Sequence, residues 1–197
     1  MKKVVKLAVS VFLLGSGGCI INIELIYSLH PLYTDQDVIF EPALLGEWVS
    51  EDDSTETMTF EKDGESKYKL IYIDSDSVEG EFIVQLLRIK GALFMDLFSG
   101  EKDLKLNAMH MFVLLPVHGF FLISQLDSTL QLSFLEHDWL EKLLEKKPGA
   151  IRHEKVNGGI VLTAPPKELQ KFLLKHLKTE DAFSDGSKMK RKKGGQE

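Results

Sequence analysis

Short runs in which apolar and polar residues alternate fill most of the chain from residue 44 onward. In "SKYKLIYI", residues 66–73, Tyr68, Leu70 and Tyr72 share one side and two lysines take the other. Successive side chains of a strand point to opposite faces of its sheet. This period of two therefore predicts strands with one buried face.

Similar runs recur between glycine-containing or polar turns. The stretch "EFIVQLLRIKGALFMDLFSG", residues 81–100, predicts two strands that meet at Lys90-Gly91. Residues 120–126 and 130–135 flank a polar tip and predict a hairpin, and a further pair of strands surrounds residues 157–159. We count about eight strands. Because most connections are short, neighbouring strands are expected to be antiparallel.

Two segments have the period of helices instead. Asp138 is expected to be the N-cap of the first, with Glu141 completing a capping box, and this helix is expected to end before Pro148-Gly149. The second follows Pro165-Pro166. One face of the second helix is apolar and needs a surface to cover. That face consists of Leu169, Phe172, Leu173, His176 and Leu177. The pattern as a whole predicts a mainly β (α+β) domain over residues 44–183, an antiparallel barrel with two accessory helices.

The N-terminal residues have the order of a secretory signal peptide. A basic start with three lysines precedes an apolar run from Leu7 to Leu14, and small residues then lead to Cys19. Cys19 is the single cysteine in the chain, so no internal disulfide can form.

This arrangement resembles a bacterial lipoprotein signal, in which residues 1–18 are removed and the new N-terminal cysteine is acylated. The resemblance implies that Cys19 is lipidated, that residues 19–43 are the lipidated N-terminus and a linker, and that acyl chains on Cys19 anchor the protein to a membrane. Ile20 follows the cysteine instead of aspartate, which implies sorting to the outer membrane with the body facing the periplasm.

Two features of the same segment leave other readings open. Ser16 stands where such signals usually have leucine, and the residues after Cys19 are apolar. Leu7 to Ile26 is about long enough to span a bilayer as an uncleaved anchor, although Asn22, Glu24 and several glycines make it a poor span. A buried structural cysteine is a third reading.

The stretch "LLGEWVSED", residues 44–52, carries Gly46 and Trp48 at the start of the first predicted barrel strand. This motif resembles the opening of lipocalins and related small barrels. The resemblance implies that Trp48 closes the barrel floor, that Gly46 lets the chain enter tightly, and that an arginine stacks on the indole. Arg152 is the candidate for that arginine.

Residues 28–52 also resemble the mature N-terminal region of small bacterial lipoproteins of uncharacterised function. In those proteins a Pro-Leu-Tyr-Thr segment, here Pro31 to Thr34, precedes Leu-Leu-Gly-x-Trp. That family supplies no catalytic residues to transfer.

Charge excludes one class of partner. The formal net charge is −6, and without Lys2, Lys3 and Lys6 of the signal it becomes −9, which disfavours nucleic acid. Residues 184–197 contain five basic side chains between Lys188 and Lys193. We interpret them as a basic disordered tail, with contact to anionic lipid or lipopolysaccharide as the alternative.

Candidate chemistry is sparse. No nucleophile elbow or phosphate-binding loop occurs, so we expect a protein that is not an enzyme and needs no cofactor. His110, His118 and His153 lie in or beside predicted strands without metal-ligand spacing, and His118 is expected to be a hydrogen-bonded edge residue.

An eight-stranded barrel is either filled by side chains or holds one small ligand. We expect a small apolar ligand or another envelope protein as the partner, or a structural or assembly role if the barrel is solid. An enzyme without a recognisable motif is the third alternative. The aromatic residues expected to line the interior are Phe60, Tyr68, Tyr72, Phe94, Phe98, Phe120 and Phe134.

Overall fold

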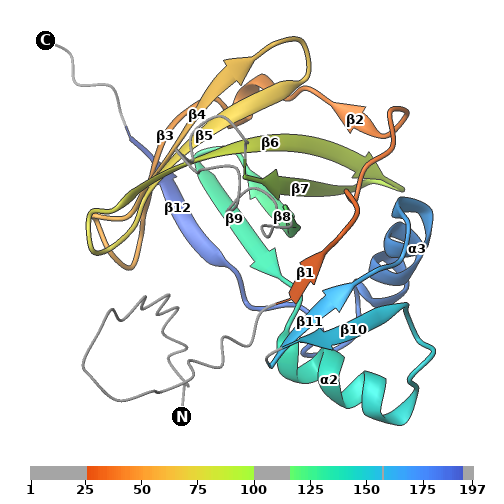
Figure 1. Cartoon of the computed structure of the whole chain (residues 1–197). Coiled ribbons are helices and arrows are strands. Elements are labelled where there is room, and N and C mark those ends of the chain that lie inside the picture. Colours follow the sequence, from red (N-terminus) through yellow and green to blue (C-terminus); the bar gives the residue numbers. More distant parts are fainter. Residues whose placement is uncertain (1–25, 100–115, 157, 193–197) are drawn as a thin grey trace, which may run out of the picture.

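Eight antiparallel strands close into a barrel in the computed structural model, which describes residues 26–99, 116–156 and 158–192 (Figure 1). Seven of these strands follow one another along the chain, each pairing with the next, and the eighth returns from the C-terminal region to pair with both the last and the first of them. In chain order they are β3 (Gly46–Ser50), β4 (Thr57–Asp63), β5 (Lys67–Ile73), β6 (Glu79–Ile89), β7 (Ala92–Phe98), β8 (His118–Leu126), β9 (Thr129–Phe134) and β12 (Ser187–Arg191). The predicted antiparallel barrel is confirmed.

Tight turns explain why neighbouring strands pair so regularly. Between β6 and β7, Lys90 and Gly91 both have positive φ angles, 48° and 87°. A two-residue turn of this kind matches the right-handed twist of the strands it joins. The predicted hairpin of β8 and β9 is also present, with an irregularity between Ile123 and Gln125 that shifts the register by one residue.

The eighth strand overturns the prediction of a disordered tail for residues 184–192, the part of that segment that the structure describes. Ser187–Arg191 form β12, which pairs with β9 and β3 and buries Met189 in the barrel. Alternation again explains the result, because the lysines on either side of Met189 face solvent. The sequence pattern of residues 187–191 had the period of a strand, but its charge concealed it.

Four further strands extend the sheet beyond the barrel. β1 (Ile26–Ser28) pairs with β8 and, in parallel, with β11 (Gly159–Leu162), which in turn pairs with β10 (His153–Val156). β2 (Val38–Ile39) pairs with the end of β6. Residues 26–43 therefore belong to the folded domain, and the prediction of a linker is wrong for them.

Two α-helices cover the outside of the barrel. The N-cap of α2 (His137–Lys146) is Glu136, so the prediction of Asp138 as the N-cap is wrong and Asp138 lies in the first turn. α3 (Pro166–His176) begins at the proline predicted for its first turn. Leu169, Phe172 and Leu173 of α3 are buried, as the apolar stripe predicted. In Figure 1 both helices lie beside β10 and β11, on the side of the barrel where β1 runs.

The protein consequently has two hydrophobic cores. One fills the barrel, and the other lies between the barrel's outer face, the helices and the segment around Leu32. Buried residues of the barrel core are Leu44, Trp48, Phe60, Tyr68, Leu70, Val84, Leu86, Leu93, Met95, Ile123, Leu130, Leu132 and Met189.

This division corrects the predicted barrel lining. Phe60 and Tyr68 do face the interior, and Tyr72 packs against the same core. Phe94 and Phe120 belong to the outer core instead. Both lie on strands whose two faces are apolar, because the helices bury the outer face of β7 and β8, and alternation alone cannot assign such a face.

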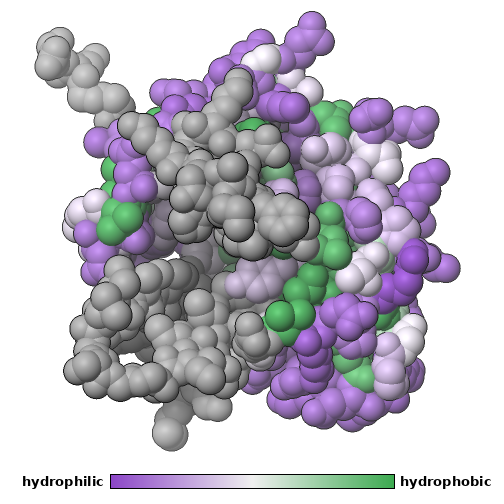
Figure 2. All heavy atoms as spheres, viewed as in Figure 1, coloured by the Kyte–Doolittle hydropathy of each residue, from purple (hydrophilic) through white to green (hydrophobic). Residues whose placement is uncertain are grey.

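The surface of the described residues is mostly hydrophilic. On the face shown in Figure 2, hydrophobic side chains form only a narrow band among polar ones. Val78 and Val156 are the exposed large hydrophobic residues within the described ranges. No helix in those ranges is long and apolar enough to cross a bilayer.

One end of the barrel is closed by Trp48 and Arg191. Trp48 is fully buried, and its Nε1 donates a hydrogen bond to the Leu44 carbonyl at 2.9 Å. The Arg191 guanidinium lies 4.2 Å from the centre of the indole ring. It also donates to the carbonyl oxygens of Leu45, at 2.7 Å, and Ala43. These carbonyls belong to or follow the 3₁₀ helix η1 (Pro42–Leu44), so one cation fixes both the indole and the chain that caps this end.

The arginine that stacks on Trp48 is therefore not Arg152, and that prediction is wrong. Arg152 forms an exposed ion pair with Glu168 at 3.0 Å. Gly46 makes room for Arg191, since a Cβ there would lie 3.1 Å from Nη1, and its φ of 109° is one that L side chains rarely adopt.

We expect Arg191→Gln to lower the free energy of unfolding by about 3 kcal/mol, because two charge-assisted hydrogen bonds and a cation–π contact are lost. Urea unfolding followed by Trp fluorescence measures the change. Lys190→Gln is the matched control, because its exposed ion pair with Glu51 contributes less than about 1 kcal/mol. Equal stability of the two variants would contradict the assigned role of Arg191.

Candidate functional site

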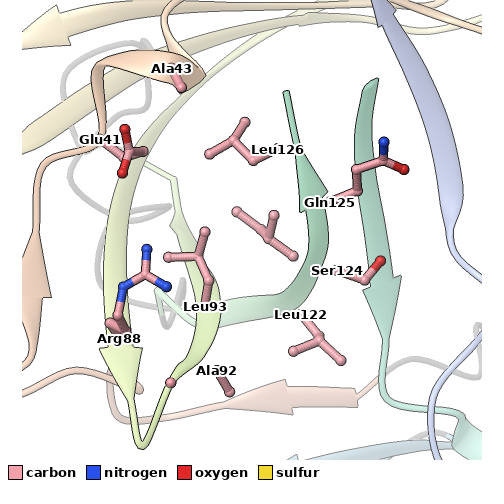
Figure 3. A pocket seen from close by; sticks show the side chains of 11 residues that line it. Glu41, Ala43, Arg88, Ala92, Leu93, Leu122, Ser124, Gln125 and Leu126 are labelled. Carbon is pink, nitrogen blue, oxygen red and sulfur yellow. The ribbon is translucent and has the colours of Figure 1, made fainter. Parts of the chain in front are cut away.

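A pocket of about 430 Å³ opens at the end of the barrel that η1 caps. Its walls come from the segment before and within η1, the turn between β6 and β7, and the end of β8. Figure 3 shows charged side chains on one side, polar ones on the other and leucines between them. The lining residues are Glu41, Ala43, Arg88, Gly91, Ala92, Leu93, Leu122, Ile123, Ser124, Gln125 and Leu126.

The irregularity in β8 shapes this pocket. The register between β8 and β9 shifts between Ile123 and Gln125, so Ser124 is the extra residue on the bulged strand. Such a bulge bends a strand and redirects its side chains. Residues on both sides of the bulge line the pocket, which includes Leu122 as well as the core residue Ile123.

The wall that carries Glu41 is held by a buried tyrosine. The Tyr68 hydroxyl accepts a hydrogen bond from the Glu41 backbone N–H at 2.6 Å and donates to the Glu41 carbonyl at 3.1 Å. Phe40 stacks on the same ring, with centroids 5.0 Å apart. The Tyr68 pKa is raised because of burial, which keeps the hydroxyl protonated and able to donate. The Glu41 backbone is thus fixed by contacts in which the Glu41 side chain takes no part.

Asp37 attaches the segment that leads to Glu41 to helix α3, which covers the outer core. Its carboxylate accepts hydrogen bonds from Thr34 and from the Gln170 side chain of α3, the latter at 2.7 Å. The Asp37 carbonyl accepts from the Arg88 backbone N–H at 3.1 Å. Hydrogen bonding, chiefly from Thr34, lowers the pKa of Asp37 and keeps it ionised. Through these bonds Asp37 ties the segment before Glu41 to both β6 and α3.

A second polar feature lies on the outer face of the barrel, away from the pocket lining. Asp96 is almost fully buried, and its Oδ1 lies 2.7 Å from Nδ1 of His118. Its Oδ2 accepts a hydrogen bond from the Leu32 backbone N–H at 2.7 Å. His118 also stacks on Phe98, with centroids 4.7 Å apart. The predicted hydrogen bonding of His118 is confirmed. His118 is not on an edge strand, however, because β8 pairs with β7 and also with β9 and β1.

Among the described residues, Asp96 forms hydrogen bonds with the His118 side chain and the Leu32 backbone N–H. The bond to Leu32 attaches the segment around this residue to the outer face of the barrel.

The other sequence-predicted residues do not gather at the pocket. His153 bonds to the Ile151 carbonyl, while Cys19 and His110 lie outside the described residues. Among the residues that the structure describes, no group of three or more His, Cys, Asp or Glu side chains could hold a metal ion. Glu41 and Arg88 were missed by the sequence analysis, because only the fold brings residues 47 positions apart to one opening.

Comparison with known proteins adds no relative: no protein family, no curated protein and no solved structure matches this chain.

The raised pKa of Asp96 gives a testable pH dependence. Burial is the main cause, opposed by the hydrogen bond and charge of His118 and by the Leu32 N–H. The native state therefore keeps the Asp96 proton at pH values at which the unfolded chain, with a pKa of 3.8, has lost it. This contribution to stability is present below pH 3.8 and is lost as the pH rises through the raised native pKa.

The His118→Gln variant is compared with the double variant His118→Gln/Asp96→Asn, so that Asp96 is the residue that differs. We expect the free energy of unfolding of His118→Gln to fall, relative to the double variant, as the pH rises from about 4 to about 7. Urea unfolding at several pH values measures the difference. A difference that does not change with pH would contradict the assignment.

Proposed function

We propose that this is a lipid-anchored protein of the bacterial cell envelope, held by acyl chains on Cys19 and facing the periplasm from the outer membrane. Its barrel domain binds a small ligand at the pocket beside η1 and performs no catalysis. The observation that carries the binding role is the pocket itself, in which an apolar floor lies between a charged side and a polar side. Ligand sites combine apolar surface with a few fixed polar groups in this way.

The barrel core supports a site at the end of the barrel rather than along its axis. The interior is occupied by aliphatic side chains together with Trp48, Phe60 and Tyr68, each of which is at most 1% exposed. A ligand that entered there would have to displace well-packed side chains, which costs several kcal/mol for each large residue. The pocket needs no such displacement.

Support for the anchor comes from the sequence at residues 1–19. A basic start, an apolar run and small residues precede the single cysteine. Six residues lie between Cys19 and Ile26, where the described structure begins, so the two are seven residue steps apart. A chain of that length spans at most about 25 Å, so β1 would lie close to the membrane surface.

The packed barrel core also favours a second candidate function, an assembly role. A solid barrel is a rigid body, and its exposed strands could dock on another envelope protein. Among the described strands, β10 lies at an edge of the sheet, where backbone groups can pair with a partner's strand.

We expect Cys19→Ser to abolish acylation and to move the protein from the membrane fraction to the soluble fraction. Mass spectrometry of the N-terminus and fractionation of the producing cell measure both effects. Ser16→Ala is the matched control, because it keeps a small residue and leaves the thiol in place. An intact Met1 with an unmodified Cys19 would contradict lipidation and would favour the uncleaved anchor.

We expect protein purified from its own host to carry a small molecule that native mass spectrometry detects as an added mass. The bound mass should be released on denaturation. A mass equal to that of the processed polypeptide alone, in repeated preparations that retain the native fold, would count against ligand binding and would favour the assembly role.

A further inference from the structure

We propose that the pocket beside η1 binds a small zwitterion with an apolar side chain, of the chemical class of an aliphatic α-amino acid. The inference rests on the proposed binding function and names its ligand class. Glu41 would hold the ammonium group, Arg88 the carboxylate, and the leucines between the two sides the hydrocarbon part.

The charges of the lining carry the first step. Of the eleven lining residues, Glu41 is the one acidic and Arg88 the one basic residue. Figure 3 shows both on the same side, with the Arg88 guanidinium directed toward the end of the pocket where the Glu41 carboxylate lies. A ligand with only an anionic group would meet Arg88 favourably and Glu41 unfavourably, whereas a zwitterion satisfies both.

Neither charge is used elsewhere in the described part of the chain. The Arg88 guanidinium and the Glu41 carboxylate form no ion pair there, with each other or with a third residue. Five other lysines or arginines do pair with acidic residues on the surface: Lys69, Arg152, Lys155, Lys190 and Lys192. The two pocket charges are therefore open to a ligand.

Both charged residues sit on fixed backbone. Arg88 lies on β6, paired with Leu93 of β7, and its N–H bonds to Asp37. Glu41 is held at its N–H and its carbonyl by Tyr68. Fixed positions lower the entropy cost of binding and set the separation of the two ligand charges. An arginine also offers a planar pair of donors that matches a carboxylate.

The remaining lining determines the rest of the ligand. Leu93, Leu122 and Leu126 lie between the charged and polar sides, which favours a branched or linear hydrocarbon group. Opposite, the Gln125 amide already donates to Asp127, so it offers the ligand little. A dianionic phosphate does not fit, because a single guanidinium beside a carboxylate cannot balance two negative charges.

Leucine is the probe, compared with two analogues of the same carbon body. Isopentylamine lacks the carboxylate, and isocaproate lacks the ammonium. Titration of the full-length protein is followed by the methyl NMR signals of Leu93, Leu122 and Leu126, which locate the site as well as measure the Kd. The variants are Arg88→Gln and Glu41→Gln, with Arg152→Gln and Glu154→Gln as matched exposed controls outside the pocket.

We expect leucine to bind the parent protein more tightly than either analogue does. Each pocket variant should raise the Kd for leucine about tenfold or more, because one charged hydrogen bond is lost. Arg88→Gln should remove the advantage of leucine over isopentylamine, and Glu41→Gln the advantage over isocaproate. The control variants should leave all three affinities unchanged.

Binding of isocaproate as tight as that of leucine, or an unchanged leucine Kd in both pocket variants, would overturn the zwitterion assignment. If leucine leaves the pocket methyl signals unmoved but the host-purified protein carries another small molecule, the ligand class is wrong and the binding function stands. If neither is found, both proposals fail.

Discussion

The guanidinium of Arg191 is the contact on which the rest of the architecture depends. It stacks on Trp48 of the first barrel strand and donates to two carbonyls of the segment that caps the barrel. Because Arg191 ends the last strand, this one side chain joins the closing strand, the opening strand and η1. These contacts fix the segment around η1, from which Glu41 and Ala43 line the pocket.

A second constraint arises because the barrel's outer face is apolar as well as its inner face. β7 buries Leu93 and Met95 inside, and Phe94 and Asp96 outside. The helices and the N-terminal segment must cover that outer face, and the buried Asp96 carboxylate fixes the segment through the Leu32 N–H. The segment then continues through β2 to Glu41. The position of Glu41, which is proposed to bind the ligand's ammonium group, thus depends on how this segment covers the outer face of the barrel.

The proposed binding site lies at the barrel end, which agrees with a filled interior. A packed core gives stability, while the end, with its bulge in β8 and its short 3₁₀ cap, supplies the opening. The two charges that face this opening are the features from which its ligand chemistry is inferred.

Local pattern determined a large part of this protein. Alternation in residues 66–73 and 81–98, the Lys90-Gly91 turn and the apolar stripe of α3 identified strands, hairpins and helix, since each depends on neighbours in sequence. Tertiary structure decided the rest. Met189 and Arg191 sit in a basic segment that becomes a strand only where β9 and β3 offer open edges. Likewise, Arg191 rather than Arg152 reaches Trp48, and Glu41 meets Arg88, because these contacts depend on barrel closure, which no local period encodes.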